Sequence, residues 1–122
     1  MSQILAIDIG NDSTKISSIV NGHIKIVLNG SSGRNTSTIV SFGDKNRVLG
    51  VAAKTGEQRN LKSSVRNFKT FLSAPFTSDA LETEKKFTTC ALVPDSNNEI
   101  AVSVNYMGEK SLFTATQCLA MH

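Results

Sequence analysis

Two apolar stretches on either side of a short polar turn constrain the fold of the N-terminal part of this chain. Residues 4–9 are nearly all apolar, the turn-prone run Gly10-Asn11-Asp12 follows, and residues 14–20 read as a second strand. Asn21-Gly22 then supplies the two positive-φ positions that a tight hairpin turn requires. Residues 23–28 make a third strand. The sequence therefore predicts an antiparallel meander at the N-terminus.

The remaining residues alternate between strand-like and helix-like segments. We expect a hairpin from residues 38–42 and 47–49, helices over residues 51–58 and 64–72, and paired strands over residues 87–93 and 100–106. Thr114 and Gln117 have the spacing of a capping box, in which the two side chains satisfy free amides at a helix start. The sequence therefore predicts an α/β fold of the mixed, α+β kind.

Composition excludes several classes of protein. The 122 residues carry 13 basic and 10 acidic side chains spread along the chain, without the clustered basic runs and interleaved aromatics of nucleic-acid binders. No apolar run approaches the roughly 20 residues of a membrane span. Cys90 and Cys118 are too far apart for a CxxC motif, so we expect two reduced thiols. We expect a soluble, cytoplasmic chain that binds neither nucleic acid nor membrane.

Asp8 is the first residue that is hard to explain by structure alone, because it interrupts an apolar strand. Burying a carboxylate costs several kcal/mol unless it is paired or serves a metal ion. One interpretation is that Asp8 caps the turn by accepting backbone amides. The other is a carboxylate near Mg²⁺, acting directly or through water. The residue alone leaves these two interpretations about even.

The turn after Asp8 favours the second interpretation. Gly10 lets a polyanion approach the backbone, and the successive amides of Asn11, Asp12 and Ser13 can form an anion-binding nest. Neither the Walker nor the dinucleotide-binding glycine pattern is present in the sequence. The sequence is therefore typical of a phosphate-binding hairpin, although Asp-x-Gly is a weak signal by itself.

Lys69 is the other candidate functional residue. It stands on the helix predicted over residues 64–72, with Val65, Phe68 and Leu72 at spacings of three and four. A lysine in such a place is more often a solvated side chain whose stem covers apolar surface. His23 and His122 have no Asp or Ser at motif spacing, so we assign them no catalytic role.

Five segments, in order along the chain, follow the pattern of one known family: Ile7-Asp8-Ile9-Gly10, Gly33-Arg34-Asn35-Thr36, residues 41–54, residues 64–69 and residues 105–117. These segments resemble the seventy-kilodalton heat-shock protein superfamily, and in particular its hundred-and-ten-kilodalton branch. The resemblance covers essentially the whole chain, and the segments near residues 42–47 and 106–109 favour the larger branch.

The resemblance implies a fold and a division of the chain. The fold would be an incomplete lobe of an actin-like, ribonuclease-H-like ATPase domain, with the N-terminal meander and an outer subdomain. Residues 1–122 would be a partial nucleotide-binding domain. Residues 1–36 would form the phosphate-hairpin sheet, residues 37–112 the outer subdomain, and residues 113–122 the start of a helix that returns to the core.

The resemblance also implies ligands and roles. ATP or ADP with Mg²⁺ would be the cofactor of the complete protein. Gly10, Asn11, Asp12 and Ser13 would form the first phosphate loop, Asp8 would lie near the hydration shell of the Mg²⁺ ion, and Lys69 would match the catalytic lysine that helps to hold the γ-phosphate and the attacking water. Such a role is electrostatic, because phosphoryl transfer needs positioned positive charge.

The sequence departs from the pattern of this family at two places. Most ATP-hydrolysing members have two threonines where this chain has Asn11 and Asp12, and a second carboxylate near phosphate oxygens is repulsive unless magnesium screens it. This departure favours binding over hydrolysis. Ser37 replaces the usual proline, which removes a rigid restraint from the turn.

The leading hypothesis is the N-terminal portion of an ATP-binding chaperone of the hundred-and-ten-kilodalton type. The partners of the complete protein would be unfolded polypeptides and a seventy-kilodalton chaperone, whose nucleotide exchange it would speed. The alternatives are a sugar-kinase fragment of the same actin-like clan and a short, non-catalytic interaction module. Because a cleft needs two walls, we expect no turnover and feeble or absent ATP binding from residues 1–122 alone.

Overall fold

The computed structural model describes residues 3–122 and contains ten strands and six helices. The strands are β1 (Leu5–Ile9), β2 (Ser13–Val20), β3 (His23–Ile26), β4 (Thr36–Ser37), β5 (Ile39–Phe42), β6 (Arg47–Leu49), β7 (Ser64–Arg66), β8 (Ala91–Pro94), β9 (Ile100–Tyr106) and β10 (Glu109–Thr114). The α-helices are α1 (Gly50–Gly56), α2 (Asp79–Glu84) and α3 (Ala115–Met121), and the 3₁₀ helices are η1 (Glu57–Arg59), η2 (Leu61–Ser63) and η3 (Phe68–Phe71).

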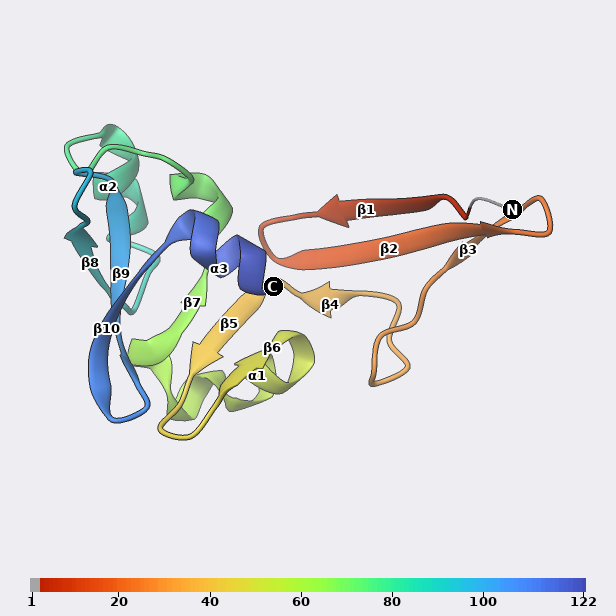
Figure 1. The fold of residues 1–122 in the computed structure, drawn as a ribbon, viewed down its shortest axis with the longest axis horizontal. Helices are drawn as coiled ribbons and strands as arrows, with labels where there is room; N and C mark the ends of the chain where they lie inside the picture. Colours follow the sequence, from red (N-terminus) through yellow and green to blue (C-terminus); the bar gives the residue numbers. More distant parts are fainter. Residues whose placement is uncertain (1–2) are drawn as a thin grey trace.

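The N-terminal strands form an arm that extends away from the rest of the molecule (Figure 1). Strands β1, β2 and β3 pair in that order, each antiparallel to the next, and β4 pairs with the first residues of β2. The turn between β2 and β3 consists of Asn21 and Gly22, both at positive φ, as the tight hairpin requires. The predicted N-terminal meander is confirmed.

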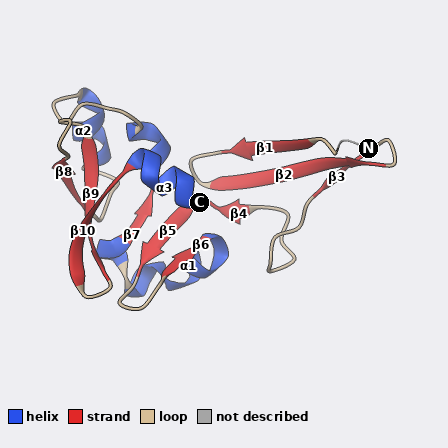
Figure 2. Ribbon diagram, viewed as in Figure 1, coloured by secondary structure: helices blue, strands red, loops and turns tan. Residues whose placement is uncertain are grey.

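The body of the molecule contains two further antiparallel sheets. Their strand orders are β6-β5-β7 and β10-β9-β8, and Figure 2 shows α1 beside β6 and α2 near the ends of β8 and β9. Strand β5 is buried along its whole length. Phe42 at its end stacks on Phe113 of β10 with ring centroids 4.5 Å apart, which joins the two sheets through their aromatic side chains. The predicted mixed fold class is confirmed.

Helix α3 closes the core of the body. Its capping box forms as predicted: the amide of Gln117 donates to the Thr114 hydroxyl at 3.2 Å, and the amide of Thr114 donates to the Gln117 side chain at 2.9 Å. Ala115 and Cys118 of α3 are buried in the core, and the helix packs against η3. The orientation of η3 therefore depends on α3.

The helix predicted over residues 64–72 is wrong in its first half. Ser64 and Val65 belong to β7, where they pair with Ser41 and Val40 of β5. Asn67 then adopts a left-handed conformation with φ of 57°, which ends the strand and starts the short helix η3. The spacing of the apolar residues is compatible with one long helix and also with a strand followed by a short helix. Residues 64–66 form a strand because they pair with β5, where Ser64 and Val65 are buried.

The sequence prediction also missed α2 and placed the next strand too early. Residues 79–84 form α2, and the chain continues in turns until β8 begins at Ala91 rather than at Phe87. Leu81 is the one strongly buried apolar side chain of α2, so the segment has little of the periodicity that identifies a helix.

Both faces of the arm expose apolar side chains. Leu5 and Ile7 of β1 lie on one face, and the paired residues Ile19 and Ile24 lie on the other. Ile24 keeps 78% of its surface exposed and Ile7 keeps 59%. Patches of this kind on soluble proteins usually mark interaction surfaces. Among the helices of residues 3–122, none has the length and apolar character needed to cross a membrane.

Candidate functional site

The hairpin turn between β1 and β2 lies at the end of the arm nearest the body (Figure 1). The amide of Gly10 donates to the carbonyl of Ser13 at 3.0 Å and closes the turn. The amide of Thr38 donates to the carbonyl of Asp12 at 2.9 Å, and Ser13 pairs with Ser37 of β4. The turn is therefore held from both sides by backbone hydrogen bonds.

Glycine is the only residue type that fits at position 10 without a shift of the backbone. A Cβ atom on Gly10 would lie 2.8 Å from the carbonyl oxygen of Ser13, which is closer than carbon and oxygen atoms normally approach. The absence of a side chain also leaves the backbone open to an incoming ligand. The predicted role of Gly10 in phosphate binding stays a prediction, but its role in the turn is a geometric requirement.

The turn presents free backbone donors to solvent. Asn11 and Asp12 are exposed, and Ser13 is half-buried. Within residues 3–122, the amides of Asn11 and Asp12 donate no hydrogen bond to the protein. Exposed, unpaired amides in succession are what an anion-binding nest needs. The predicted phosphate loop is thus chemically possible and stays a prediction.

Lys69 lies next to this turn, although it is 60 residues away in sequence. Its neighbours on η3, Phe68 and Phe71, are fully buried in the core of the body, and they fix the short helix in place. The Lys69 ammonium donates to the carbonyl of Ile9, the residue before Gly10. The structure therefore brings together the predicted lysine and the predicted phosphate loop. The side chain is half-buried, so its charge is partly shielded from solvent.

Asp8 is exposed, which contradicts the buried carboxylate expected from the apolar strand around it. The reason is that most of β1 is uncovered on both faces: Ile7 on one side of Asp8 is also exposed, and Ile9 on the other side is only half-buried. Asp8 stands opposite Lys15 in the pairing of β1 with β2. The described residues give the Asp8 side chain no backbone amide as a hydrogen-bond donor, so the turn-capping interpretation is not supported either.

A hydrogen-bonded group at the base of the arm was not foreseen from the sequence. His122 Nε2 lies 2.8 Å from the hydroxyl of Thr14, which lies 3.0 Å from the hydroxyl of Thr38. These contacts connect the end of α3 to β2 of the arm and to the chain just before β5. Burial lowers the pKa of His122, which favours the neutral ring. No sequence spacing signals this contact, because its partners lie 108 residues apart.

The arrangement at the turn suits an anion better than a metal ion alone. Across residues 3–122, no group of three His, Cys, Asp or Glu side chains is placed to hold a metal ion. The turn instead offers backbone amides and the ammonium of Lys69. A magnesium ion prefers several waters and phosphate oxygens to an all-protein cage, so Asp8 could contribute to such a site only together with a bound polyphosphate.

The comparisons with known proteins match this chain to heat-shock proteins. A family model described as Hsp70 protein matches residues 4–122. The chain is 39% identical over 121 residues to a heat shock protein homolog of Candida glabrata, in an alignment that covers 99% of the chain and 17% of that relative. It is 36% identical over 121 residues to a heat shock protein homolog of Saccharomyces cerevisiae, in an alignment that covers 99% of the chain and 18% of that relative. The chain thus spans about a sixth of the length of these relatives.

Proposed function

Because this chain belongs to the Hsp70 family, as an N-terminal segment resembling its 110-kDa branch, we propose that it supplies one wall of an ATP-phosphate site. In the complete protein that site would serve a chaperone that binds unfolded polypeptides and speeds nucleotide exchange on a 70-kDa partner in the cytoplasm. The observation that carries the proposal is the contact of Lys69 with the backbone of Ile9, next to the free amides of the glycine turn.

Each residue of the wall has a distinct task in this proposal. The amides of Asn11, Asp12 and Ser13 would bind phosphate oxygens, since they belong to an exposed turn whose backbone is held in place. The ammonium of Lys69 would lie against the terminal phosphate, where positive charge stabilises the oxygens that gain negative charge during transfer. Asp8 would orient waters of a magnesium ion. The ion, when bound, supplies the charge that balances Asp8 and Asp12.

Asp12 makes the proposed site better suited to binding than to hydrolysis. Its carboxylate lies in the turn that would hold the phosphates, and it is exposed and forms no ion pair with any of residues 3–122. A carboxylate in the same turn as a bound phosphate repels that phosphate unless a metal ion screens the two negative charges. We therefore propose that this member acts mainly through nucleotide-dependent binding of its partners.

The exposed faces of the arm favour the interpretation that other parts of a complete protein cover them. Nine large apolar side chains of residues 3–28 are more than one-third exposed, and they lie on both faces of the arm. A self-contained interaction module would cover at least one such face. No observation favours the sugar-kinase alternative. The proposal therefore treats residues 37–112 as an outer subdomain and the arm as part of a larger sheet.

The test is to place residues 1–122 in the context of a complete relative. They would replace the corresponding segment of the Candida glabrata heat shock protein homolog, and ATP and ADP binding would be measured by calorimetry. Because Lys69 would contact only the terminal phosphate, Lys69→Ala should weaken ATP binding about tenfold, as expected for a charge-assisted hydrogen bond. The same substitution should leave ADP binding within about twofold, by the same reasoning.

The matched control is Lys45→Ala, which removes an exposed lysine from the turn between β5 and β6. It should change neither affinity. Equal losses of ATP and ADP binding in the Lys69 variant would contradict the assignment to the terminal phosphate. The isolated chain should show no micromolar ATP binding in the same experiment, and such binding would show that the second wall is not needed.

A further inference from the structure

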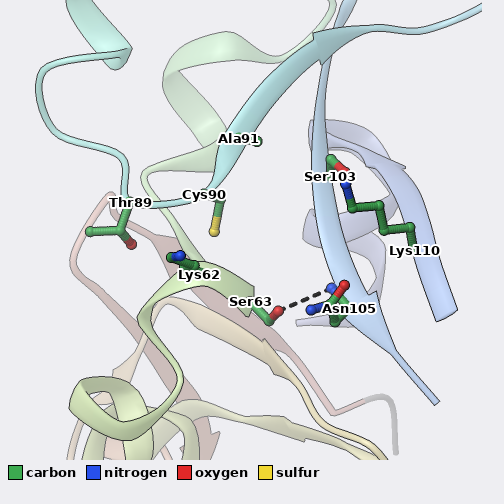
Figure 3. Close-up of a pocket in the computed structure, with 8 residues that line it drawn as sticks. All are labelled: Lys62, Ser63, Thr89, Cys90, Ala91, Ser103, Asn105 and Lys110. Atoms are coloured by element: carbon green, nitrogen blue, oxygen red, sulfur yellow. Dashed lines mark hydrogen bonds between the residues drawn. The ribbon is translucent and has the colours of Figure 1, made fainter. Parts of the chain in front are cut away.

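A second cluster of positive charge lies in the body, on the far side of the β8-β9-β10 sheet from the core. Val102 and Val104 of β9 face the core, so the alternating residues Ser103 and Asn105 face the other way. Together with η2 they line a cavity of about 490 Å³. We call this cavity the lysine pocket; its lining includes Lys62, Ser63, Cys90, Ser103, Asn105 and Lys110 (Figure 3).

The lysine pocket is positively charged and has no acidic side chain in its lining. Lys62 comes from η2 and Lys110 from β10, so two separate elements each contribute a lysine to the lining of one cavity. Neither lysine forms an ion pair within residues 3–122. Two like charges at one concave surface attract an anion and raise its local concentration.

The pocket also offers hydrogen-bond donors that the protein does not use. Ser63, with 3% of its surface exposed, accepts a hydrogen bond from the amide of Asn105 at 3.0 Å and ties η2 to β9. In the part of the chain that the structure describes, the hydroxyl of Ser103 and the side-chain amide of Asn105 make no hydrogen bond. Free donors in the same cavity as two lysines match the oxygens of a phosphate group.

A neighbouring cavity gives room for the rest of a ligand. It has a volume of about 600 Å³, shares Lys62, Ser63 and Asn105 with the lysine pocket, and adds the side chains of Arg59 and Asp44. Both volumes fall in the range of small-molecule sites, roughly 300–1,000 Å³. The carboxylate of Asp44 accepts hydrogen bonds and repels a second anionic group. This second cavity therefore suits the uncharged, hydroxyl-bearing part of a ligand.

We propose that the lysine pocket binds the phosphate group of a small phosphorylated metabolite whose hydroxyl-bearing body extends toward Asp44. Lys62 and Lys110 supply the charge, and Ser103 and Asn105 supply the hydrogen bonds. The site lies on the outer part of the body and shares no residue with the turn at Gly10. A negative result at the lysine pocket would therefore not count against the proposed ATP-phosphate site, and the reverse is also true.

The experiment is a titration of the ¹⁵N-labelled 122-residue chain with pyrophosphate and with a sugar phosphate, followed by amide chemical shifts. The expected result is saturable shifts at Ser63, Ser103 and Lys110 with both probes. The double variant Lys62→Gln, Lys110→Gln should weaken binding at least tenfold. Lys86→Gln, which removes an exposed lysine that lines neither cavity, should leave it unchanged.

Three results would overturn the proposal. Shifts that spread over all lysines without saturation would show non-specific attraction, and saturable shifts that persist in the double variant would place the site elsewhere. Saturation of these amides by a hexaglutamate peptide, with no response to either phosphate probe, would mean that the pocket takes an acidic polypeptide. Both lysines are exposed, so the variants should keep the fold, which far-UV circular dichroism verifies.

Discussion

Burial keeps the thiols of Cys90 and Cys118 protonated in the folded chain. It raises the pKa of Cys90 to about 11, and that of Cys118 to about 12 with a further contribution from the neighbouring Cys90 charge. Since the thiolate is the reactive form, both thiols should react with iodoacetamide at pH 8 at least about a hundredfold more slowly than free cysteine. Mass spectrometry of the alkylated chain over time measures these rates.

In urea both thiols should react at the ordinary rate, which serves as the control. The raised pKa values also predict how stability changes with pH. Between about pH 9 and pH 11 the unfolded thiols ionise while the folded ones do not, so the folded state loses stability as the pH rises through this window. Rapid alkylation of the native chain at pH 8 would contradict both expectations.

Gly50 holds the junction between the arm and the body. Its φ is +57°, and a Cβ atom there would lie 2.5 Å from Cγ2 of Thr36 in β4. Gly50→Ala should therefore lower the free energy of unfolding by about 1–3 kcal/mol, from the left-handed backbone and the contact together. Urea titration followed by circular dichroism measures the change.

Gly56 at the other end of α1 is the matched control, because its φ is −88° and a Cβ atom there meets open space. Gly56→Ala should leave stability unchanged or raise it by up to about 1 kcal/mol, since it reduces the freedom of the unfolded chain. If both variants lose the same stability, the strain assigned to Gly50 is wrong.

Among the elements, α3 controls the position of η3 and hence of Lys69. Thr114→Ala removes the hydroxyl that accepts from Gln117, and the loss of such a cap costs about 1 kcal/mol. Because α3 packs against η3, the amide of Thr70, which follows Lys69 on η3 and donates to the carbonyl of Asn67, should also exchange hydrogen faster in this variant. Urea titration and hydrogen exchange measure the two effects.

Thr116→Ala is the control within the same helix, since Thr116 is exposed in α3 and does not cap it. It should change stability by less than about 0.5 kcal/mol. A loss of stability in Thr116→Ala equal to that of the Thr114 variant would show that the helix is sensitive to any substitution.

The sequence predicted elements with local signals and failed where tertiary contacts decide. Asn21 and Gly22 mark the hairpin, and Thr114 and Gln117 mark α3, because a turn or a cap depends on neighbours in the chain. By contrast, residues 64–66 form a strand only because β5 lies beside them. A helical spacing of apolar residues does not reveal that pairing.

The candidate site was predictable in its parts but only partly in its geometry. The glycine turn follows from local sequence, and Lys69 became a candidate through a family resemblance rather than through its own neighbours. Its contact with Ile9 spans 60 residues, which no local pattern encodes. The burial of Asp8 was predicted wrongly because an apolar strand does not specify that another element covers it.

At the scale of the whole molecule, the exposed faces of the arm should dominate its interaction with apolar probes. We expect strong fluorescence of the dye ANS, because Ile7 and Ile24 expose most of their surface on opposite faces. The double variant Ile7→Lys, Ile24→Lys should lose at least about half of this signal, since it places a charge in each patch. It should keep its stability within about 0.5 kcal/mol, as surface substitutions usually do.

Phe87→Lys is the control for this measurement, because Phe87 is 62% exposed but lies in the body. It removes a single exposed aromatic side chain and should lower the ANS signal only slightly. A large loss in the Phe87 variant with none in the arm variant would place the accessible apolar surface in the body. It would also remove the main physical reason for treating the arm as part of a larger sheet, since that reading depends on both faces of β1 to β3 being open.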